Sequence, residues 1–257
     1  MNLPAFDIIG DVAVVEVPEG RGEEAVANLI VKNHPHVKTV LAKTGGIEGR
    51  YRTRKLKKIH GKVTETEHRE YGCRLRLDVT KAYFSPREST ERQRIAEYVN
   101  KGEMVMVMFS GICPLPVIIA KQKPDVDRIY GIEINPYAHN YAIDNVRINK
   151  VGHIVEPVLG DVKKVGKQYF GIFDRVVMPL PKEGYKYLPE AFHFLKSKGG
   201  VIHFYSYEHE GELFEKSVDI VNKAAEKMNK KVRILNKRKV LPYGPRVWKV
   251  CIEFEVK

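Results

Sequence analysis

The sequence predicts an α/β protein in which a small α+β domain over residues 1–84 precedes a larger, doubly wound domain over residues 85–257. From about residue 85, apolar runs alternate with amphipathic segments, which is the pattern of a parallel sheet covered by helices. Before that point the sequence shows short alternating strands with one helical segment between them. The length of 257 residues allows one large core and one small one.

The small domain is expected to combine short strands with one helix. In the helical segment, Ala25, Leu29 and Ile30 recur with the 3.6-residue period and should form its apolar face. The expected elements, in chain order, are two short strands over 6–17 around Gly10-Asp11, a helix over 23–33, a strand over 37–42, a turn at Gly45-Gly46, and two strands over 64–79 around Gly72.

A strongly basic segment, residues 50–58, follows the glycine turn and holds six basic residues in nine. On an extended strand, Arg50, Arg52 and Arg54 would share one face. The whole chain has a formal net charge of +12 and a pI near 9.4. Such a surplus attracts polyanions, of which nucleic acid is the commonest. A surface rich in Lys–Glu pairs, of the kind thermophile proteins carry, is the alternative, and charge alone does not decide between them.

The larger domain should begin with a helix at Ser89, where Ser89, Thr90 and Glu91 supply capping residues for the first turn. Continuous apolar runs such as 104–109 are typical of buried strands. In a parallel sheet the ligand crevice lies outside the carboxyl ends of the strands. The expected elements are helices over 89–98, 136–149, 188–196 and 214–228, and strands over 104–109, 129–134, 154–159, 173–178, 200–205, 231–241 and 247–256.

The composition argues against a membrane or secreted protein. No apolar run reaches the roughly 18 residues of a membrane helix, and the first residues lack the basic flank and apolar block of a secretion signal. Cys73, Cys113 and Cys251 lie far apart in the sequence and lack metal-ligand spacing. Isolated thiols in odd number fit a reducing compartment, so we expect a cytoplasmic protein without a metal site.

Three residues at successive strand ends could bind a ligand. Gly111 follows the first strand of the larger domain, Glu133 closes the second strand, and Asp161 follows the third. An acid at the second strand end binds ribose hydroxyls in both nicotinamide and S-adenosylmethionine (AdoMet) enzymes. The G-x-G-x-x-G phosphate cradle is absent, which disfavours a dinucleotide, whereas AdoMet carries no phosphate. A plain α/β domain with polar strand ends is the alternative.

Several segments carry a family resemblance. Residues 78–95 resemble the hallmark segment of the archaeal and eukaryotic tRNA guanine-37 N(1)-methyltransferases, and residues 108–114 and 130–136 resemble that family's two cofactor motifs. The likeness continues through Asn145-x-x-x-Asn149-Lys150, Gly160-Asp161, residues 175–181 and residues 199–205, and it covers nearly the whole chain from Phe6. It implies a Rossmann-like class I AdoMet-dependent methyltransferase domain after the small domain. It also implies AdoMet as cofactor and the anticodon loop of tRNA as partner. Apart from the resemblance, we expect a monomer that does not bind a membrane.

The resemblance assigns roles to particular positions. The family's general base matches Glu91, which would remove the N1 proton of guanine. The arginine that stabilises charge on the exocyclic oxygen matches Arg52, with Arg54 or Arg50 as alternatives, and Tyr83 matches an aromatic residue that could stack on an extruded base. The other expected contacts are Arg92, Phe109, Gly111, Glu133, Ile134, Asp161, Val162 and Pro179 for the cofactor, and Arg54 and Pro181 for the RNA.

Each of these residues also has an ordinary structural interpretation. Glu91 could complete a helix start, Arg52 could be one solvated charge among six, and Tyr83 could be part of the core. His203 is interpreted as a satisfied strand residue and is not predicted to be a base.

The chain departs from the family pattern at three places. The family usually has Asp at the position of Val107, Gly at that of Cys113, and Asn-Leu-Pro where this chain has Pro179-Leu180-Pro181. An Asn side chain could hydrogen-bond substrate or cofactor, whereas proline offers only its carbonyl, so selection for a single target atom should loosen. An archaeal branch resembling this chain is associated with a second activity, methylation of carbon 7 of the wyosine intermediate imG-14, and a dual role is therefore a second expectation.

Two further alternatives concern the whole activity. A related wybutosine enzyme transfers the 3-amino-3-carboxypropyl group of AdoMet instead of the methyl group, but the Pro-Leu-Pro loop and the helix start at Glu91 favour the methyltransferase branch. The other alternative, motivated by Val107 and Cys113, is a non-catalytic tRNA-binding module. Full-length family members also carry a further N-terminal domain that grips the tRNA elbow, and this chain begins where that domain should end.

Overall fold

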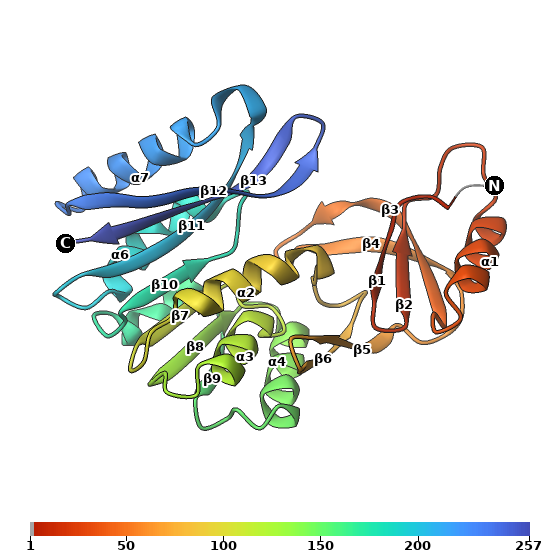
Figure 1. The fold of residues 1–257 in the computed structure, drawn as a ribbon, viewed down its shortest axis with the longest axis horizontal. Helices are drawn as coiled ribbons and strands as arrows, with labels where there is room; N and C mark the ends of the chain where they lie inside the picture. The colour runs from red at the N-terminus through yellow and green to blue at the C-terminus, as the bar shows by residue number, and fades with distance from the viewer. Residues whose placement is uncertain (1–2) are drawn as a thin grey trace.

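The described residues form a four-stranded sheet near the N-terminus and a seven-stranded sheet in the rest of the chain, with a two-stranded hairpin between them in the sequence (Figure 1). The computed structural model describes residues 3–257, with the backbone alone for residues 47 and 48, so the first two residues of the predicted small domain lie outside the described part. The N-terminal strands and one helix form one end of the molecule, and a seven-stranded sheet with its covering helices forms the other.

The N-terminal sheet has the strand order β1-β2-β3-β4, with β2 and β3 parallel and the other pairs antiparallel. Helix α1 connects the two parallel strands and buries Val26, Ala27 and Ile30 against them. The predicted apolar face is therefore wrong in part, because Ala25 points to solvent while Val26 and Ala27 face the sheet. The elements are β1 (Phe6–Ile9), β2 (Val12–Val15), α1 (Glu23–Asn33), β3 (Thr39–Glu48) and β4 (Thr53–His60).

The predicted turn at Gly45-Gly46 is also wrong. Strand β3 continues through both glycines, and the register steps from Lys43 opposite Leu56 to Ile47 opposite Arg54. Glycines accommodate such a β-bulge, because the extra residues can bend away from the strand pairing without a steric clash. The turn instead covers residues 49–52.

The basic segment is consequently split between two structures. Arg50 and Arg52 lie in the turn, and Arg52 has a positive φ of 53°. Arg54 lies in β4. The predicted single extended face for these three arginines is therefore wrong, because the turn breaks the two-residue alternation before Arg54.

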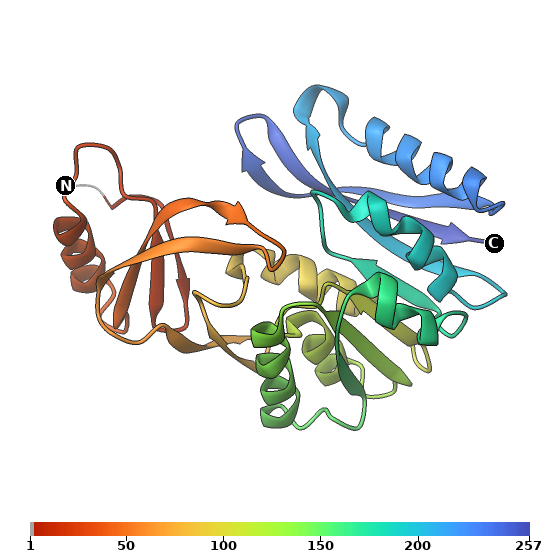
Figure 2. The same ribbon diagram turned by 180° about the vertical axis from the view of Figure 1, so that it is seen from behind.

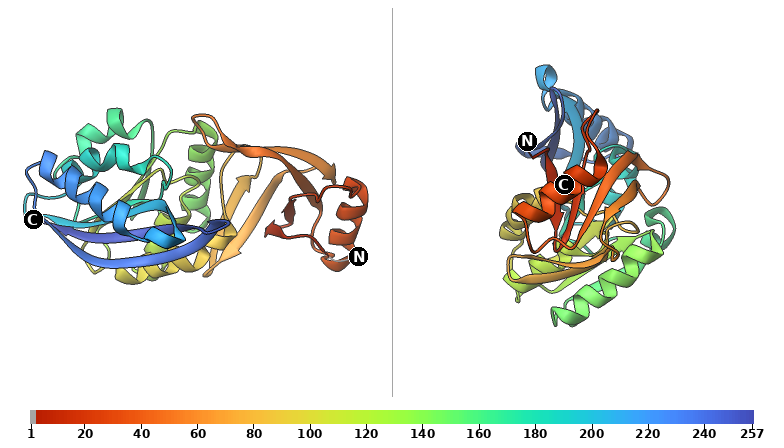
Figure 3. Two further views of the ribbon diagram at one scale, coloured as in Figure 1. Left: turned by 90° about the horizontal axis from the view of Figure 1, so that it is seen from above. Right: turned by 90° about the vertical axis from the view of Figure 1, so that its right-hand side faces the viewer.

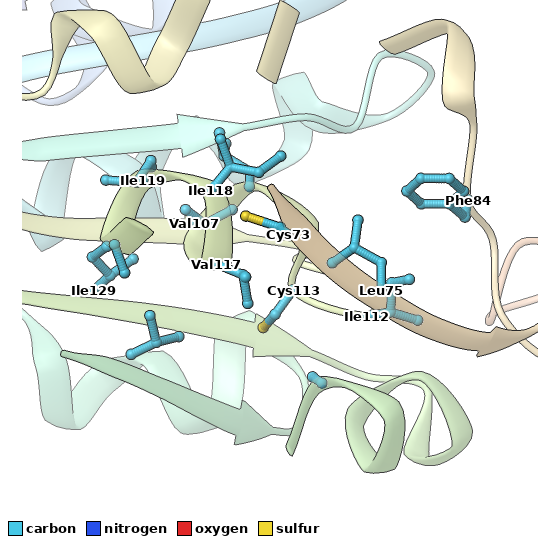
Figure 4. Close-up of a cluster of buried hydrophobic side chains, with 14 of the residues drawn as sticks. Cys73, Leu75, Phe84, Val107, Ile112, Cys113, Val117, Ile118, Ile119 and Ile129 are labelled. Carbon is cyan, nitrogen blue, oxygen red and sulfur yellow. The ribbon is translucent and has the colours of Figure 1, made fainter. Parts of the chain in front are cut away.

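The hairpin of β5 (Glu65–Glu70) and β6 (Cys73–Asp78) packs against the large domain's helices. Leu75 belongs to the same apolar core as Ile112 and Val117 (Figure 4). Asn145 and Asn149 accept hydrogen bonds from backbone N–H groups of β6 at 2.7 and 2.9 Å. This hairpin fixes the small sheet relative to the large one, and the predicted division after residue 84 stays a prediction.

The large sheet has the order β12-β13-β11-β10-β7-β8-β9. The five strands from β11 to β9 are parallel, as predicted, but β13 runs antiparallel to both of its neighbours. A connection of two residues between β12 and β13 permits only an antiparallel hairpin, so the expectation of a wholly parallel sheet is wrong at this edge. The strands are β7 (Met104–Met108), β8 (Arg128–Glu133), β9 (Val155–Leu159), β10 (Arg175–Met178), β11 (Gly200–His209), β12 (Val232–Gly244) and β13 (Val247–Val256).

Helices cover both faces of this sheet (Figure 3, left). Along β7, Val105 and Val107 enter the core on the face of α2, α3 and α4, while Met106 and Met108 enter the core on the face of α5, α6 and α7. This two-sided burial confirms the doubly wound α/β class. The helices are α2 (Ser89–Tyr98), α3 (Pro114–Gln122), α4 (Pro136–Ile148), α5 (Val162–Val165), α6 (Leu188–Phe194) and α7 (Glu215–Lys227).

Helix α2 begins and ends at the predicted residues, but not for the predicted reason. A 3₁₀ turn over Pro86–Glu88 leads into it, and its start has no side-chain cap hydrogen bond. The Glu91 carboxylate is instead committed to other side chains, so its interpretation as a capping residue is wrong. Within residues 3–257, no helix is both long and apolar enough to cross a lipid bilayer.

Candidate functional site

An open cleft of about 1280 Å³ lies at the carboxyl ends of the parallel strands and meets the β3–β4 turn. Parallel strands bring the residues that follow each strand to one edge, so distant loops converge there. Figure 2 shows the β3–β4 hairpin, in orange, extending from the small sheet toward the large one. The predicted site residues that line the cleft are Arg52, Tyr83, Phe109, Gly111, Glu133, Ile134, Asp161, Val162, Pro179 and Pro181.

The loop after β7 wraps around the carboxylate of Glu133, the last residue of β8. Phe109 and Gly111 have positive φ values of 55° and 57°, which lets the chain turn tightly. The Gly111 N–H donates to Oε2 of Glu133 at 2.7 Å, and the Asn135 N–H donates to Oε1 at 2.7 Å. Burial raises the pKa of Glu133 even though these backbone bonds oppose it. The carboxylate keeps further acceptor positions and lines the cleft, as binding of a ribose hydroxyl requires.

Asp161 meets the basic turn of the small sheet across the cleft. Its Oδ1 accepts from the N–H of Lys163 at 3.0 Å and so caps α5. Its Oδ2 lies 3.4 Å from Nη2 of Arg50. Arg50 and Arg52 both line the cleft, so the fold brings the arginine-rich turn and the strand-end acids to one site.

A smaller cavity of about 670 Å³ adjoins the cleft, and several residues line both spaces. The shared residues are Tyr83, Glu88, Phe109, Gly111 and Pro179. Beyond them the wall is largely apolar and comes from α2, β7, α3 and β10. Glu91 also lines this cavity, and it thus faces a space that is continuous with the cleft.

The Glu91 carboxylate is held by three short hydrogen bonds. Arg94, one turn along α2, donates from Nε to Oε2 at 2.8 Å and from Nη2 to Oε1 at 2.6 Å. The Tyr205 hydroxyl donates to Oε1 at 2.5 Å. A carboxylate has about four acceptor positions, so the contacts among the described residues leave one open, on Oε2. Nε of Arg238, on the edge strand β12, lies 3.8 Å from that oxygen.

Lys249 on β13 is a second buried charge at this cavity. Its Nζ lies 2.7 Å from Oε1 of Glu88 and 4.9 Å from the ring centroid of Tyr205. Lys249 is nearly removed from solvent while Glu88 is partly exposed, and a buried ammonium needs such a partner. It ties the start of α2 to β13 and fixes the wall that carries Glu91.

Two predicted site residues lie elsewhere. Arg92 lines the smaller cavity instead of the cleft that holds Glu133 and Asp161. Its guanidinium donates to both oxygens of the buried Glu70 at 2.5 and 2.7 Å and to the backbone oxygen of Ser85 at 3.1 Å. Arg54 lies in β4 and lines neither the cleft nor the smaller cavity. The structure therefore gives Arg92 a tethering position between α2 and the β5–β6 hairpin.

The three departures from the expected motifs lie at or behind the site. Val107 is buried in the wall of the smaller cavity, where a carboxylate would need a partner. Cys113 has a positive φ of 59°, a conformation that favours glycine, and burial raises the pKa of its thiol to about 12. Pro179 lines both spaces, so the Pro-Leu-Pro loop lies at the junction between them.

Sequence reasoning missed Arg94, Tyr205 and Lys249. The spacing of Glu91 and Arg94 was a usable signal, because residues three apart on a helix share a face. The charged residues of β13 alternate with apolar ones, which also indicates a polar cluster on one face. Tyr205 gave no such signal, since a tyrosine at the end of an apolar run is expected to be an ordinary core residue.

The residues of the cleft and the smaller cavity can bind a ligand, accept a proton and stabilise negative charge. The cleft can hold an extended ligand against two strand-end acids, and the adjoining cavity can hold a planar group next to Glu91. A carboxylate in such a wall can accept a proton from a ring nitrogen. Guanidinium groups from the β3–β4 turn supply positive charge at the same site.

Comparison with known proteins gives two family matches. Residues 66–235 match the family model of the TRM5/TYW2 methyltransferase domain. Residues 3–64 match that of the TYW2 N-terminal domain. Together the two matches cover most of both sheets.

Several named proteins are similar along most of their length. The chain is 40% identical over 98% of its length to the tRNA (guanine(37)-N(1))-methyltransferase Trm5b of Pyrococcus abyssi, covering 74% of that protein. It is 35% identical to the tRNA(Phe) (4-demethylwyosine(37)-C(7)) aminocarboxypropyltransferase of Methanocaldococcus jannaschii, covering 96% of each. It is 32% identical over 86% of its length to the tRNA (guanine(37)-N(1))/4-demethylwyosine(37)-methyltransferase Taw22 of Nanoarchaeum equitans, covering 90% of that protein.

Solved structures agree with these relationships. The crystal structure of Trm5b from Pyrococcus abyssi superposes with a TM-score of 0.87 at 38% identity, covering 99% of this chain and 76% of that one. The complex structure of aTrm5 and tRNALeu gives a TM-score of 0.87 at 31% identity, covering 98% of this chain and 72% of that one. The structure of M. jannaschii TYW2 in complex with AdoMet gives a TM-score of 0.78 at 30% identity, covering 98% of this chain and 99% of that one.

Proposed function

The chain belongs to the TRM5/TYW2 methyltransferase family, and on that basis we propose that it methylates guanine 37 of tRNA at N(1) with AdoMet as methyl donor. The observation that carries this proposal is the position of Glu91. Glu91 lines a largely apolar cavity that shares five lining residues with the strand-end cleft. A base bound in the cavity and a donor bound in the cleft would therefore meet.

The residues of the cleft fit AdoMet. Glu133 offers acceptor positions for ribose hydroxyls, Asp161 lies at the next strand end, and Phe109 with Ile134 supplies apolar wall. The backbone at Gly111 approaches the cleft through a positive φ. When bound, AdoMet supplies a sulfonium methyl group, which the lone pair of the target nitrogen takes while the sulfur keeps the electrons of the broken bond.

Glu91 is the residue we assign as general base. The N1 of guanine carries a proton and is a poor nucleophile until that proton leaves. The open acceptor position on Oε2 can take it, while Arg94 and Tyr205 hold the carboxylate still. The proton ends on Glu91 and passes to solvent when the product leaves.

Arg52 is the residue we assign to the guanine oxygen. As N1 loses its proton, negative charge spreads to the exocyclic oxygen, which a guanidinium stabilises. Arg50 is engaged with Asp161 and Arg54 lies outside both spaces, which favours Arg52 among the three. Tyr83 lines both spaces and can stack on the extruded base, with Pro181 at the cleft wall beside the RNA.

A second methylation, at carbon 7 of imG-14, is supported by the Pro-Leu-Pro loop at the junction of the two spaces. Proline there offers no side-chain donor to distinguish one target atom from another. Transfer of the aminocarboxypropyl group is not favoured, although one relative named for it is 35% identical. The two transfers differ in the mass that they add to the nucleoside.

The test is incubation with AdoMet and tRNA transcripts that carry guanine at position 37, followed by mass analysis of nucleosides. We expect 1-methylguanosine, and with tRNA carrying imG-14 a mass gain of one methyl group. Glu91→Gln should remove the first product while AdoMet binding persists. Absence of a methylated base from both RNAs would refute the proposal, and binding of tRNA without binding of AdoMet would favour a non-catalytic module.

We further propose a monomeric, cytoplasmic enzyme built from a small domain over 1–84 and a catalytic domain over 85–257. Three buried free thiols support a reducing compartment. Light scattering of the purified protein tests the oligomeric state, and limited proteolysis near residue 84 tests the division.

A further inference from the structure

A buried network of charged groups continues behind Glu91. Arg94 donates to both oxygens of Glu91 and, through Nη1, to Oε1 of Glu253 on β13. All three side chains are less than a tenth exposed. One guanidinium is therefore shared by two carboxylates, of which one lines the proposed base pocket and the other does not.

His203 on β11 lies next to Glu253 but beyond hydrogen-bond distance. Nε2 of His203 lies 2.8 Å from Nη1 of Arg175, and because arginine can only donate, Nε2 must accept. The remaining ring proton then belongs on Nδ1, which lies 3.8 Å from Oε1 of Glu253. Burial lowers the pKa of His203, so the ring is neutral at neutral pH. Arg175 itself is balanced by Glu103 at 2.7 and 2.9 Å.

This cluster is better suited to charge tuning than to metal binding. Donor atoms of His203, Cys251 and Glu253 lie within 4.8 Å of one another. Guanidinium groups of Arg94 and Arg175 already donate into the cluster, and their positive charge disfavours a metal cation. Burial also raises the pKa of the Cys251 thiol well above its usual range, so no thiolate is present to bind one.

Four elements place charged or titratable groups near Glu91. On α2 there is Arg94, on β11 the neutral Tyr205, on β12 the half-exposed Arg238, and on β13 the neutral Cys251. Glu253 acts on Glu91 through Arg94. A carboxylate bound by a single unshared guanidinium holds a proton weakly and is a poor base. When Arg94 also binds a second carboxylate, its positive charge acts less strongly on the first one.

We propose that Glu253 is a positioning residue for Glu91: by accepting from Arg94, it takes up part of the positive charge that Arg94 would otherwise direct at the proposed base. This inference rests on the proposed role of Glu91 as general base. It explains why the carboxylate of Glu253 lies buried in the interior strand β13, where an apolar side chain would pack at less cost.

The competing explanation is that the network only fixes α2 to the sheet. A structural role would change the amount of folded enzyme or its rate at every pH equally. A tuning role would move the acid limb of the pH–rate profile. The two explanations therefore differ in a measurement that does not depend on stability.

The experiment compares Glu253→Gln with Glu103→Gln in single-turnover methylation of guanine-37 tRNA between pH 4.5 and 9, with AdoMet and tRNA saturating. The Glu253→Gln change keeps a side-chain oxygen for Arg94 but removes the charge. We expect the acid limb of Glu253→Gln to move down by about one pH unit and its plateau to fall roughly three- to tenfold, because a weaker base gives a slower transfer. Glu103→Gln removes a carboxylate that does not touch Arg94 and should leave the limb unchanged.

Thermal unfolding and AdoMet titration establish that each variant is folded and binds its donor, and Glu253→Asp should restore the limb. A folded Glu253→Gln enzyme with the limb of the native protein overturns the inference, as does a native profile without an acid limb in this range. A Glu91→Gln enzyme of native rate would instead overturn the proposed function, so the two failures are distinguishable.

Discussion

Nη2 of Arg50 lies 3.4 Å from Oδ2 of Asp161, and this contact joins the turn of the N-terminal sheet to the end of the third parallel strand. The two residues are separated by 111 positions in the sequence. Both residues line the cleft in which we place AdoMet, so we expect cofactor binding to depend on the position of the basic turn. The turn also carries Arg52, so the contact bears on the proposed chemistry as well.

Replacement of Asp161 by Asn should weaken AdoMet binding about 10- to 150-fold, because a hydrogen bond to a charged group contributes about 1.5 to 3 kcal/mol. Isothermal titration measures the affinity. Asp144→Asn removes a carboxylate from the exposed pair with Arg147 on α4 and serves as the control. Equal affinity of the two variants would contradict a cofactor role for Asp161.

Arg52 and Arg54 should differ sharply in their effect on methyl transfer. Loss of a group that stabilises transition-state charge typically costs about 10²- to 10³-fold in kcat, so we expect about that loss for Arg52→Ala and less than about threefold for Arg54→Ala. Both variants lose one positive charge, which makes their effects on tRNA attraction comparable. Single-turnover rates at saturating tRNA separate the two, and a larger loss in Arg54→Ala would reverse the assignment.

Glu70 should matter for stability more than for catalysis. Removal of one partner of a buried ion pair costs about 3 to 5 kcal/mol, so Glu70→Ala should lower the free energy of unfolding by about that amount. Arg74→Ala breaks the more exposed pair with Glu67 and should have a much smaller effect, because solvent screens that pair. Denaturant unfolding measures both, and equal losses would contradict the tethering position of Arg92.

The same pair should contribute to acid sensitivity. Burial raises the pKa of Glu70, but hydrogen bonds and charge from His68 and Arg92 outweigh it and lower the pKa below the usual 4.5. A carboxyl group with a lowered pKa in the folded state stabilises the protein above its unfolded pKa, and this contribution is lost as the pH falls through the folded value. Glu70→Gln should therefore flatten the fall in stability below about pH 4.5. An unchanged slope would argue against this linkage.

Pro179→Asn should narrow the choice of target atom. An asparagine amide at the junction of the two spaces could hydrogen-bond the base or the cofactor, which proline cannot do through a side chain. We expect the ratio of 1-methylguanosine to methylated imG-14 to rise at least severalfold when both RNAs compete, as a bond of about 1 kcal/mol would produce. Pro181→Asn, two residues along the same loop, is the control, and an unchanged ratio in Pro179→Asn would contradict the idea.

The large sheet could be predicted from the sequence because its signals are local and repeated. Strand β7 is a continuous apolar run, β10 is apolar after its first residue, and Glu133 closes the largely apolar β8. The turn at residues 49–52 could not be placed, because Gly45 and Gly46 look like a turn and their role as a bulge depends on pairing with β4.

The partners of the site residues were harder to predict than the residues themselves. Glu91 and Arg92 are neighbours in the sequence, yet Glu91 faces the cavity with Arg94 and Tyr205 while Arg92 turns to Glu70. On a helix, adjacent residues point about 100° apart, so a motif that names both does not assign them one role. Which of them approaches the ligand depends on packing between elements that are distant in sequence.

The position of β13 between β11 and β12 has a consequence for synthesis of the protein. Strand β12 emerges from the ribosome first but has no place in the sheet until the later β13 is inserted beside β11. The proposed base on α2 likewise lacks Lys249 and Glu253 until that moment. A nascent chain can therefore assemble its five parallel strands early, but it becomes competent for catalysis only after the last strand of the sheet has left the exit tunnel.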